Sequence, residues 1–289
     1  MAEADRRVVV VHADDVGMCH GANAAYFELF ALGVCTSGSV MVPCPWFLEV
    51  AERAAADPSI DMGIHLTLTA EKTHYKWRPL TAPPRAAGLT DPNGFFWPDV
   101  ATVRERADPD AVEAELRAQI ETALAADIDI THLDDHMGAV MAPEFCDRYI
   151  RIGLDYGLPI LLTPNLSAYG PIHNLRGVQE EPYRAHVAAA RAAGFQIFDR
   201  VLETPWDRTG TADEAYRMMI RSIAPGTTFL ALHFNAPGEL EFIEPASAHT
   251  RTEEYALFRS EGFREWLAEQ ELELSGMREF RSALRGQPS

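Results

Sequence analysis

Short apolar runs alternate with longer amphipathic stretches along nearly the whole chain, and this alternation restricts the fold more than any other feature. Unbroken β-branched or apolar runs are typical of strands buried on both faces. We expect such strands at Arg7–His12, Ser39–Val42, Met62–Leu68, Ile128–Leu133, Pro159–Leu162, Gln196–Leu202 and Thr228–His233. Helical periodicity and end signals between them predict helices at Gly21–Leu32, Trp46–Ala56, Val112–Leu124, Pro143–Tyr156, Pro182–Ala193, Ala212–Ile223 and Glu253–Glu269.

Alternation of this kind predicts an α/β fold, in which crossover helices connect the strands of a parallel sheet. The sheet is either open and doubly wound or closed into a barrel. About seven strand–helix units over 289 residues favour a distorted, TIM-like (β/α) barrel. Because no Ser/Gly-rich linker or shift of composition divides the chain, we expect residues 1–289 to form a single domain.

Composition excludes several classes of protein. The chain is 47% hydrophobic and 24% charged, as expected of a globular protein. Its 43 acidic and 25 basic residues give a net charge of −18, which repels nucleic-acid phosphates and anionic lipids. No apolar run approaches the roughly 20 residues of a membrane span, and Val8–Val11 is too short for a signal-peptide core. We therefore expect a soluble, cytoplasmic protein that binds neither nucleic acid nor membrane.

Three long connections interrupt the alternation, at Thr69–Ala107, Thr163–Glu181 and Phe234–Thr252. Connections of this length are usually functional or disordered. Aromatic residues gather in the first of them: Tyr75, Trp77, Phe95, Phe96 and Trp97. They form either a platform for a sugar face or a satellite cluster under the loop. As candidate substrate contacts we select Trp77, Trp97 and His74 from the first connection and Asn235 from the third.

Polar residues directly follow the first predicted strand and interrupt the third, which is otherwise mostly apolar. Asp14 and Asp15 come directly after the first strand, where one of them could instead cap the next helix. His65 lies within the third strand, and its alternative interpretation is a hydrogen-bonded core histidine. Such strand ends are where α/β folds build their sites.

The segment Thr131–His136 is the densest cluster of this kind. It places His132 and His136 four residues apart around Asp134 and Asp135, again as a strand ends. No cysteine lies in a comparable cluster, and the G-x-S-x-G, Walker and G-x-G-x-x-G motifs are absent from the sequence.

Parallel strands bring their carboxyl ends together, so Asp15, His65 and His136 are predicted to converge. Two histidines and one carboxylate form the facial arrangement that holds a divalent ion and leaves coordination positions open. An ion with an open position lowers the pKa of bound water and polarises a carbonyl. The neighbouring acids at 14, 134 and 135 could then serve as a general base or orient the histidines.

His233 ends the last predicted strand and precedes Phe234-Asn235-Ala236-Pro237. A histidine at this position could protonate a departing amine, or it could simply end the strand.

Several segments together resemble the YdjC-like family of carbohydrate deacetylases, in the family's order and at similar spacing. They are Val11–Gly17, Thr36–Ser39, Met41-Val42, Gly63–Leu68 and Thr131–His136. The resemblance covers about residues 7–165, and beyond that it depends mainly on His233. It implies a distorted (β/α) barrel, one divalent metal ion, and hydrolysis of an N-acetyl group from an amino sugar or short oligosaccharide.

Position by position, the resemblance implies Asp15, His65 and His136 as metal ligands, Asp14 as general base and His233 as general acid. Zinc suits these ligands best, with magnesium, manganese, cobalt and nickel as alternatives. The chain departs from the family pattern at Met137-Gly138-Ala139, where further histidines are usual, and at Phe234, which separates His233 from the following proline-containing segment. These departures affect the assignment of the general acid and the identity of the substrate.

Two other functions are compatible with the same residues. The first is a metal-dependent barrel hydrolase or isomerase that acts on another amide or on an ester. The second is a sugar-binding protein that has kept the fold and lost turnover. The sequence leaves the oligomeric state open, a homo-oligomer included.

Overall fold

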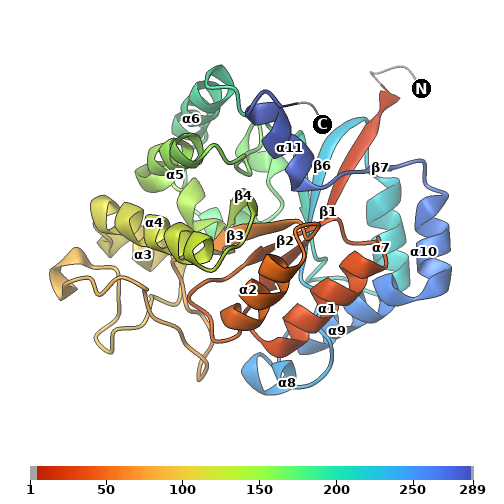
Figure 1. The fold of residues 1–289 in the computed structure, drawn as a ribbon, viewed down its shortest axis with the longest axis horizontal. Helices are drawn as coiled ribbons and strands as arrows, with labels where there is room; N and C mark the ends of the chain where they lie inside the picture. The colour runs from red at the N-terminus through yellow and green to blue at the C-terminus, as the bar shows by residue number, and fades with distance from the viewer. Residues whose placement is uncertain (1–4, 288–289) are drawn as a thin grey trace.

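A parallel β-sheet lies at the centre of the computed structural model, which describes residues 5–287 (Figure 1). The spatial order of its main strands is β4-β3-β2-β1-β6-β5, and β7 also pairs with β1. The bounds of the strands are β1 Arg7–Val16, β2 Ser37–Val40, β3 Met62–Leu66, β4 Ile130–Asp135, β5 Arg200–Glu203, β6 Gly226–Leu232 and β7 Glu273–Leu274. All pairings between these strands are parallel, so their carboxyl ends meet on one side.

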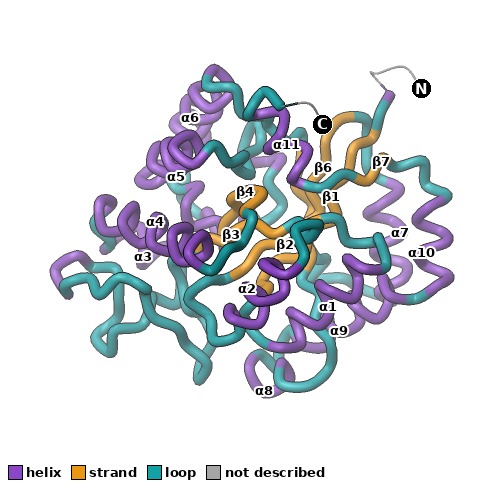
Figure 2. Tube along the Cα trace, in the orientation of Figure 1, coloured by secondary structure: helices purple, strands orange, loops and turns teal. Residues whose placement is uncertain are grey.

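Helices surround the strands on the outside, as the tube view shows (Figure 2). They are α1 His20–Ala31, α2 Phe47–Ala56, α3 Val100–Arg106, α4 Pro109–Ala125, α5 Pro143–Tyr156, α6 Glu180–Ala192, α7 Ala212–Arg221, α8 Leu240–Ile243, α9 Ala248–Arg259, α10 Glu261–Ala268 and α11 Met277–Leu284. No helix within the described residues is both long enough and apolar enough to cross a membrane.

The core forms between the sheet and these helices, and β1 runs through its middle. Val9, Val10 and Val11 are at most 1% exposed, as predicted for a strand covered on both faces. The predicted α/β class, with a parallel sheet inside a layer of helices, is thus confirmed.

The predicted strand Pro159–Leu162 is present only as a short extended segment. It forms an isolated parallel bridge between Ile160 and Leu133 of β4, and the Phe198 amide donates to the Leu162 carbonyl at 3.0 Å. The segment therefore lies between β4 and the chain that enters β5. The arrangement is consistent with the predicted distorted barrel, without a regular strand at this point.

The structure also corrects several of the sequence-based boundaries. The predicted helix Glu253–Glu269 is two helices, α9 and α10, because Ser260 between them has extended backbone angles (φ −66°, ψ 138°). The connection Thr69–Ala107 contains α3, which the sequence analysis did not predict.

The unpredicted helix α11 covers the amino ends of β3 and β4, opposite the side where the polar clusters lie. The Arg278 amide donates to Asp61 Oδ2 at 2.8 Å, and Arg281 Nη1 donates to the Ile130 carbonyl at 2.6 Å. The barrel is therefore covered at one end and accessible at the other.

Candidate metal centre

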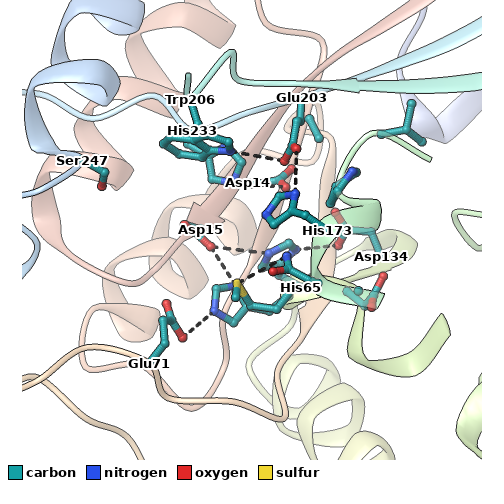
Figure 3. Close-up of a pocket in the computed structure, with 18 of the residues that line it drawn as sticks. Asp14, Asp15, His65, Glu71, Asp134, His173, Glu203, Trp206, His233 and Ser247 are labelled. Carbon is teal, nitrogen blue, oxygen red and sulfur yellow. Dashed lines mark hydrogen bonds and ion pairs between the residues drawn. The ribbon is translucent and has the colours of Figure 1, made fainter. Parts of the chain in front are cut away.

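A pocket of about 230 Å³ opens at the carboxyl ends of β1, β3, β4 and β6 (Figure 3). All five residues selected as catalytic or metal-ligating line it, together with the two acids of β4: Asp14, Asp15, His65, Asp134, Asp135, His136 and His233. The predicted convergence of Asp15, His65 and His136 is therefore present in the structure, and the other four residues lie around them.

A β-bulge at the end of β1 explains how two consecutive aspartates reach the same pocket. The sequence analysis placed Asp14 and Asp15 after the first strand, but both belong to β1. Neighbouring side chains of a regular strand point to opposite faces, but the pairing of β1 with β2 shifts register between Ala13 and Val16. Asp15 has a φ of 59°, a left-handed conformation that aspartate tolerates better than most residues.

Three potential ligand atoms face one another in the pocket. Asp15 Oδ1 lies 3.5 Å from His65 Nε2 and 3.1 Å from His136 Nδ1. The three residues are buried, and they offer ligand atoms that all lie within 4.8 Å of one another. Asp15 Oδ1 has no hydrogen-bond partner of good geometry, although it is inaccessible to solvent. Two imidazole nitrogens and one such oxygen fit a divalent ion such as zinc.

Each of these ligands is held by a charged partner on its other side. His65 Nδ1 lies 3.1 Å from Asp134 Oδ1, and His136 Nε2 lies 3.0 Å from Glu71 Oε2. Arg251 Nη1 donates to Asp15 Oδ2 at 2.6 Å. Carboxylates bound to the outer nitrogen of a histidine fix the orientation of its ring and increase its basicity. The arrangement therefore directs His65 Nε2 and His136 Nδ1 toward Asp15.

The charges around the ligands favour a cation. Burial would lower the pKa of His136, but Glu71 and Asp15 outweigh it and raise this pKa to about 9. Burial would raise the pKa of Asp15, but Arg251 and His136 hold it well below its ordinary value. A site that retains an anionic carboxylate and attracts protons to its imidazoles has the electrostatics to bind a divalent ion.

Asp14 and His233 face each other beside the three ligands, with Asp14 Oδ2 3.7 Å from His233 Nε2. Burial raises the pKa of Asp14 well above its ordinary value, mainly by removing the carboxylate from water. Burial and the Arg251 charge hold the pKa of His233 well below its ordinary value. The pair thus combines a carboxylate of raised basicity with a neutral imidazole, both within the pocket.

The two tryptophans selected as substrate contacts have other partners. The Trp77 ring is buried, with its indole N–H donating to the Thr69 carbonyl at 2.8 Å and its edge against His136. The Trp97 indole donates to the Gly88 carbonyl at 2.7 Å, and the Arg106 guanidinium lies over its ring. Both lie outside the described pocket lining, in the satellite cluster that was the alternative interpretation.

The other two selected contacts also lie outside the pocket lining. His74 is exposed on the surface of the first long connection. Asn235 is fully buried, with its amide against Cys19 at the start of α1. The intervening Phe234 is buried because its ring packs against Phe258 of α9.

Several pocket residues were not selected from the sequence. Trp206 packs edge-on against His233, with 4.7 Å between ring centroids, and its indole donates to Glu203 at 3.3 Å. The segment that carries Trp206 follows a predicted strand, and this position was the signal that could have found it. Glu71 lies on a long connection and Arg251 on α9, and no sequence spacing indicated that either belongs to the site.

The chain is similar to proteins of one family. The model of the family described as YdjC-like protein matches residues 8–269. A protein named carbohydrate deacetylase from Thermus thermophilus is 39% identical over 165 residues, which is 57% of each chain. A protein of the same name from Thermoanaerobacter pseudethanolicus is 27% identical over 247 residues, 86% of this chain and 88% of that one. The chain thus aligns with just over half of the Thermus relative.

A solved structure shares the fold over nearly its whole length. It is a protein from Enterococcus faecalis V583 described in connection with cellobiose-phosphate cleavage. The TM-score is 0.75 with 20% sequence identity, and the match covers 95% of this chain and 98% of that one. At this identity the likeness establishes the fold.

Proposed function

The chain belongs to the YdjC-like family, and from this membership and the geometry of the site we propose that it is a metal-dependent deacetylase. Its proposed substrate is an N-acetylated amino sugar or short oligosaccharide. One observation carries the proposal: the ligand atoms of Asp15, His65 and His136 converge in the pocket, beside the facing pair Asp14 and His233. The name carbohydrate deacetylase, which relatives bear, supports the substrate class.

Asp15, His65 and His136 would hold the divalent ion, for which zinc is the best match to the donor atoms. Such an ion supplies Lewis-acid polarisation to a carbonyl oxygen and to water. Asp134, Glu71 and Arg251 keep the three ligands in place through the contacts described above. The chain's own contribution at this point is therefore a rigid and electrostatically matched ligand set.

Asp14 is the general base in this proposal. Burial raises its pKa, which makes the Asp14 carboxylate a stronger base toward water than an ordinary aspartate. His233 is neutral at rest, because its pKa is low, and it faces Asp14 through Nε2. In this proposal it takes up at Nε2 the proton that Asp14 removes from water and delivers it to the departing amine. The net reaction adds water to the amide and yields acetate and a free amine.

Trp206 is the aromatic wall against which a sugar ring would pack, in place of the tryptophans selected from the sequence. Because it lies beside His233, it is also close to the reacting groups. A second, more open hollow of about 700 Å³ shares Trp206, Glu203 and His173 with the pocket. A short oligosaccharide could extend into this hollow while its acetamide group lies at the metal centre.

The direct test is to identify the products formed from a panel of N-acetylated sugars, with His65→Ala and His136→Ala as site variants. We expect acetate and free amine in equal amounts from the wild-type protein, and loss of both metal and activity in the variants. His20→Ala is the matched control, because His20 is half-exposed and lies outside the described pocket lining. Full activity in metal-free His65→Ala protein would contradict the proposal, and a different product would favour the other hydrolase.

A further inference from the structure

A chain of hydrogen bonds connects the ring of His233 to a carboxylate behind the pocket. His233 Nδ1 lies 2.9 Å from the hydroxyl of Thr204, which follows β5. This hydroxyl donates to Glu254 Oε1 at 2.8 Å. Glu254 belongs to α9, and its second oxygen accepts from the His233 backbone N–H at 2.6 Å. Both the ring and the backbone of the histidine are thus tied to one side chain.

The partners of Glu254 determine the direction of these bonds. The carboxylate accepts from Thr204, from the Tyr216 hydroxyl and from the His233 amide, and each of these groups faces it as a donor. Glu254 and Thr204 are both fully buried, so no exchange with bulk water intervenes. A hydroxyl has a single proton. Burial raises the pKa of Glu254 to about 7, so the carboxylate is ionised above this pH. When Glu254 is ionised, Thr204 gives its proton to Glu254 and can only accept from His233 Nδ1.

We propose that Thr204 and Glu254 are positioning residues that hold neutral His233 in the tautomer protonated at Nδ1. Its Nε2 then presents a lone pair toward Asp14 and the pocket. The tautomer itself follows from the hydrogen bonds to ionised Glu254, whereas its use in catalysis rests on the proposed function. In the opposite tautomer, Nε2 would already carry a proton, and His233 could not accept one from Asp14 before delivering it to an amine.

Helix α9, which carries Glu254, also supports the proposed metal ligand Asp15. Arg251 precedes Glu254 by three residues on α9, so both side chains lie on the same face. Arg251 contacts Asp15 at 2.6 Å, while Glu254 contacts His233. A change at Glu254 that shifted α9 would therefore alter metal binding, whereas loss of the tautomer alone would leave it intact.

The tautomer is measured by long-range ¹H–¹⁵N NMR of histidine-labelled protein, in which protonated and unprotonated ring nitrogens have distinct shifts. The His233 signals are identified by their absence in His233→Gln. We expect Nδ1 to be protonated in the wild-type protein, and protonation to shift toward Nε2 in Thr204→Val, which removes the acceptor. Glu254→Gln should have a similar effect. A glutamine amide has a single accepting oxygen, so it cannot accept from both Thr204 and the His233 backbone N–H.

The same variants are then tested for turnover of an N-acetylated sugar. We expect kcat to fall on the order of tenfold to a hundredfold, while KM and zinc affinity stay within about twofold of wild type. Thr69→Val is the matched control, because it removes a buried hydroxyl that has no hydrogen-bond partner and lies outside the pocket lining. It should leave the His233 signals and kcat unchanged.

Two results would overturn the inference: an Nε2-protonated His233 in the wild-type protein, or an unchanged tautomer and kcat in folded Thr204→Val. The wild-type spectrum decides the tautomer even if both variants fail to fold. It also decides the tautomer if no N-acetylated sugar is hydrolysed, so failure of the proposed function is distinguished from failure of this inference.

Discussion

Asp134 holds His65 from behind, with its Oδ1 atom 3.1 Å from Nδ1 of the ring. The carboxylate is itself fixed, because Ser39 donates to its other oxygen at 2.9 Å and His12 Nε2 lies 3.1 Å from the same atom. Because Nδ1 is held by Asp134, Nε2 is the nitrogen of His65 that is directed at Asp15. Asp134 is thus as much a part of the proposed metal centre as the ligands.

Replacing Asp134 with asparagine tests this relationship. We expect Asp134→Asn to weaken zinc binding by about tenfold to a hundredfold, because the ring loses its anionic partner and its fixed orientation. Affinity is measured by competition with a chromophoric chelator. Asp127→Asn, at an exposed position, serves as the control and should bind zinc like the wild type. An unchanged affinity in Asp134→Asn would show that the carboxylate does not support the ligand.

Zinc binding should also stabilise the folded chain. A ligand that binds only the folded state at a hundredfold excess over its Kd adds about 2.7 kcal/mol. For a chain of this size we expect Tm to rise by several degrees in thermal unfolding, and the rise to disappear in His136→Ala. The same rise in the variant would place the bound zinc elsewhere.

Asp129 gives a prediction about pH and stability at the opposite end of the barrel. Hydrogen bonds from Arg281 and Arg278 lower the pKa of Asp129 to about 2. Since the pKa is lower in the folded state, the contribution to stability is complete above the unfolded-state pKa of about 4 and is lost as pH falls toward 2.

We expect Asp129→Asn to lower the free energy of unfolding by about 1 kcal/mol at pH 7, a value reduced by solvent screening at this exposed site. The difference from wild type should shrink as pH falls below 4. Urea unfolding at a series of pH values measures it. A difference that stays constant down to pH 2 would contradict the assigned role of the two arginines.

Glu115 should anchor the long connection that carries the aromatic cluster. This buried carboxylate accepts from the Leu80 amide at 3.0 Å and from the Thr81 amide at 2.9 Å. Glu115→Ala leaves these donors unpaired, at a cost of about 1–3 kcal/mol for each one that stays buried. We expect faster tryptic cleavage after the exposed Arg85. Glu52→Ala on the exposed face of α2 is the control, and equal cleavage rates in both variants would refute the anchoring role.

Much of the fold could be predicted because local pattern and burial agree. The valines of β1 and the apolar positions of α4 mark elements that the core covers, and α5 has the predicted bounds. The short bridge at Ile160 could not be distinguished from a strand, since its irregularity depends on what lies beside it. The separation of α9 from α10 rests on the backbone angles of Ser260, which no residue type there required.

The candidate site was predictable to the extent that parallel strands share an end. The bulge that turns Asp14 and Asp15 to the same side arises from pairing with β2, so the sequence of β1 alone does not reveal it. Arg251 contacts Asp15 across 236 residues of sequence, and Thr204 contacts Glu254 across 50. Such supporting residues have no fixed spacing from the groups that they hold, and only the three-dimensional structure identifies them.

Acetate release from N-acetylated sugars by metal-depleted and zinc-restored protein tests the central claim most directly. Elemental analysis of the same samples gives the metal content per chain. We predict about one ion per chain in the active protein, loss of acetate release on chelation and its recovery with added zinc. Undiminished acetate release by protein shown to be metal-free would contradict the account, as would a zinc-loaded protein that releases no acetate from any sugar in the panel.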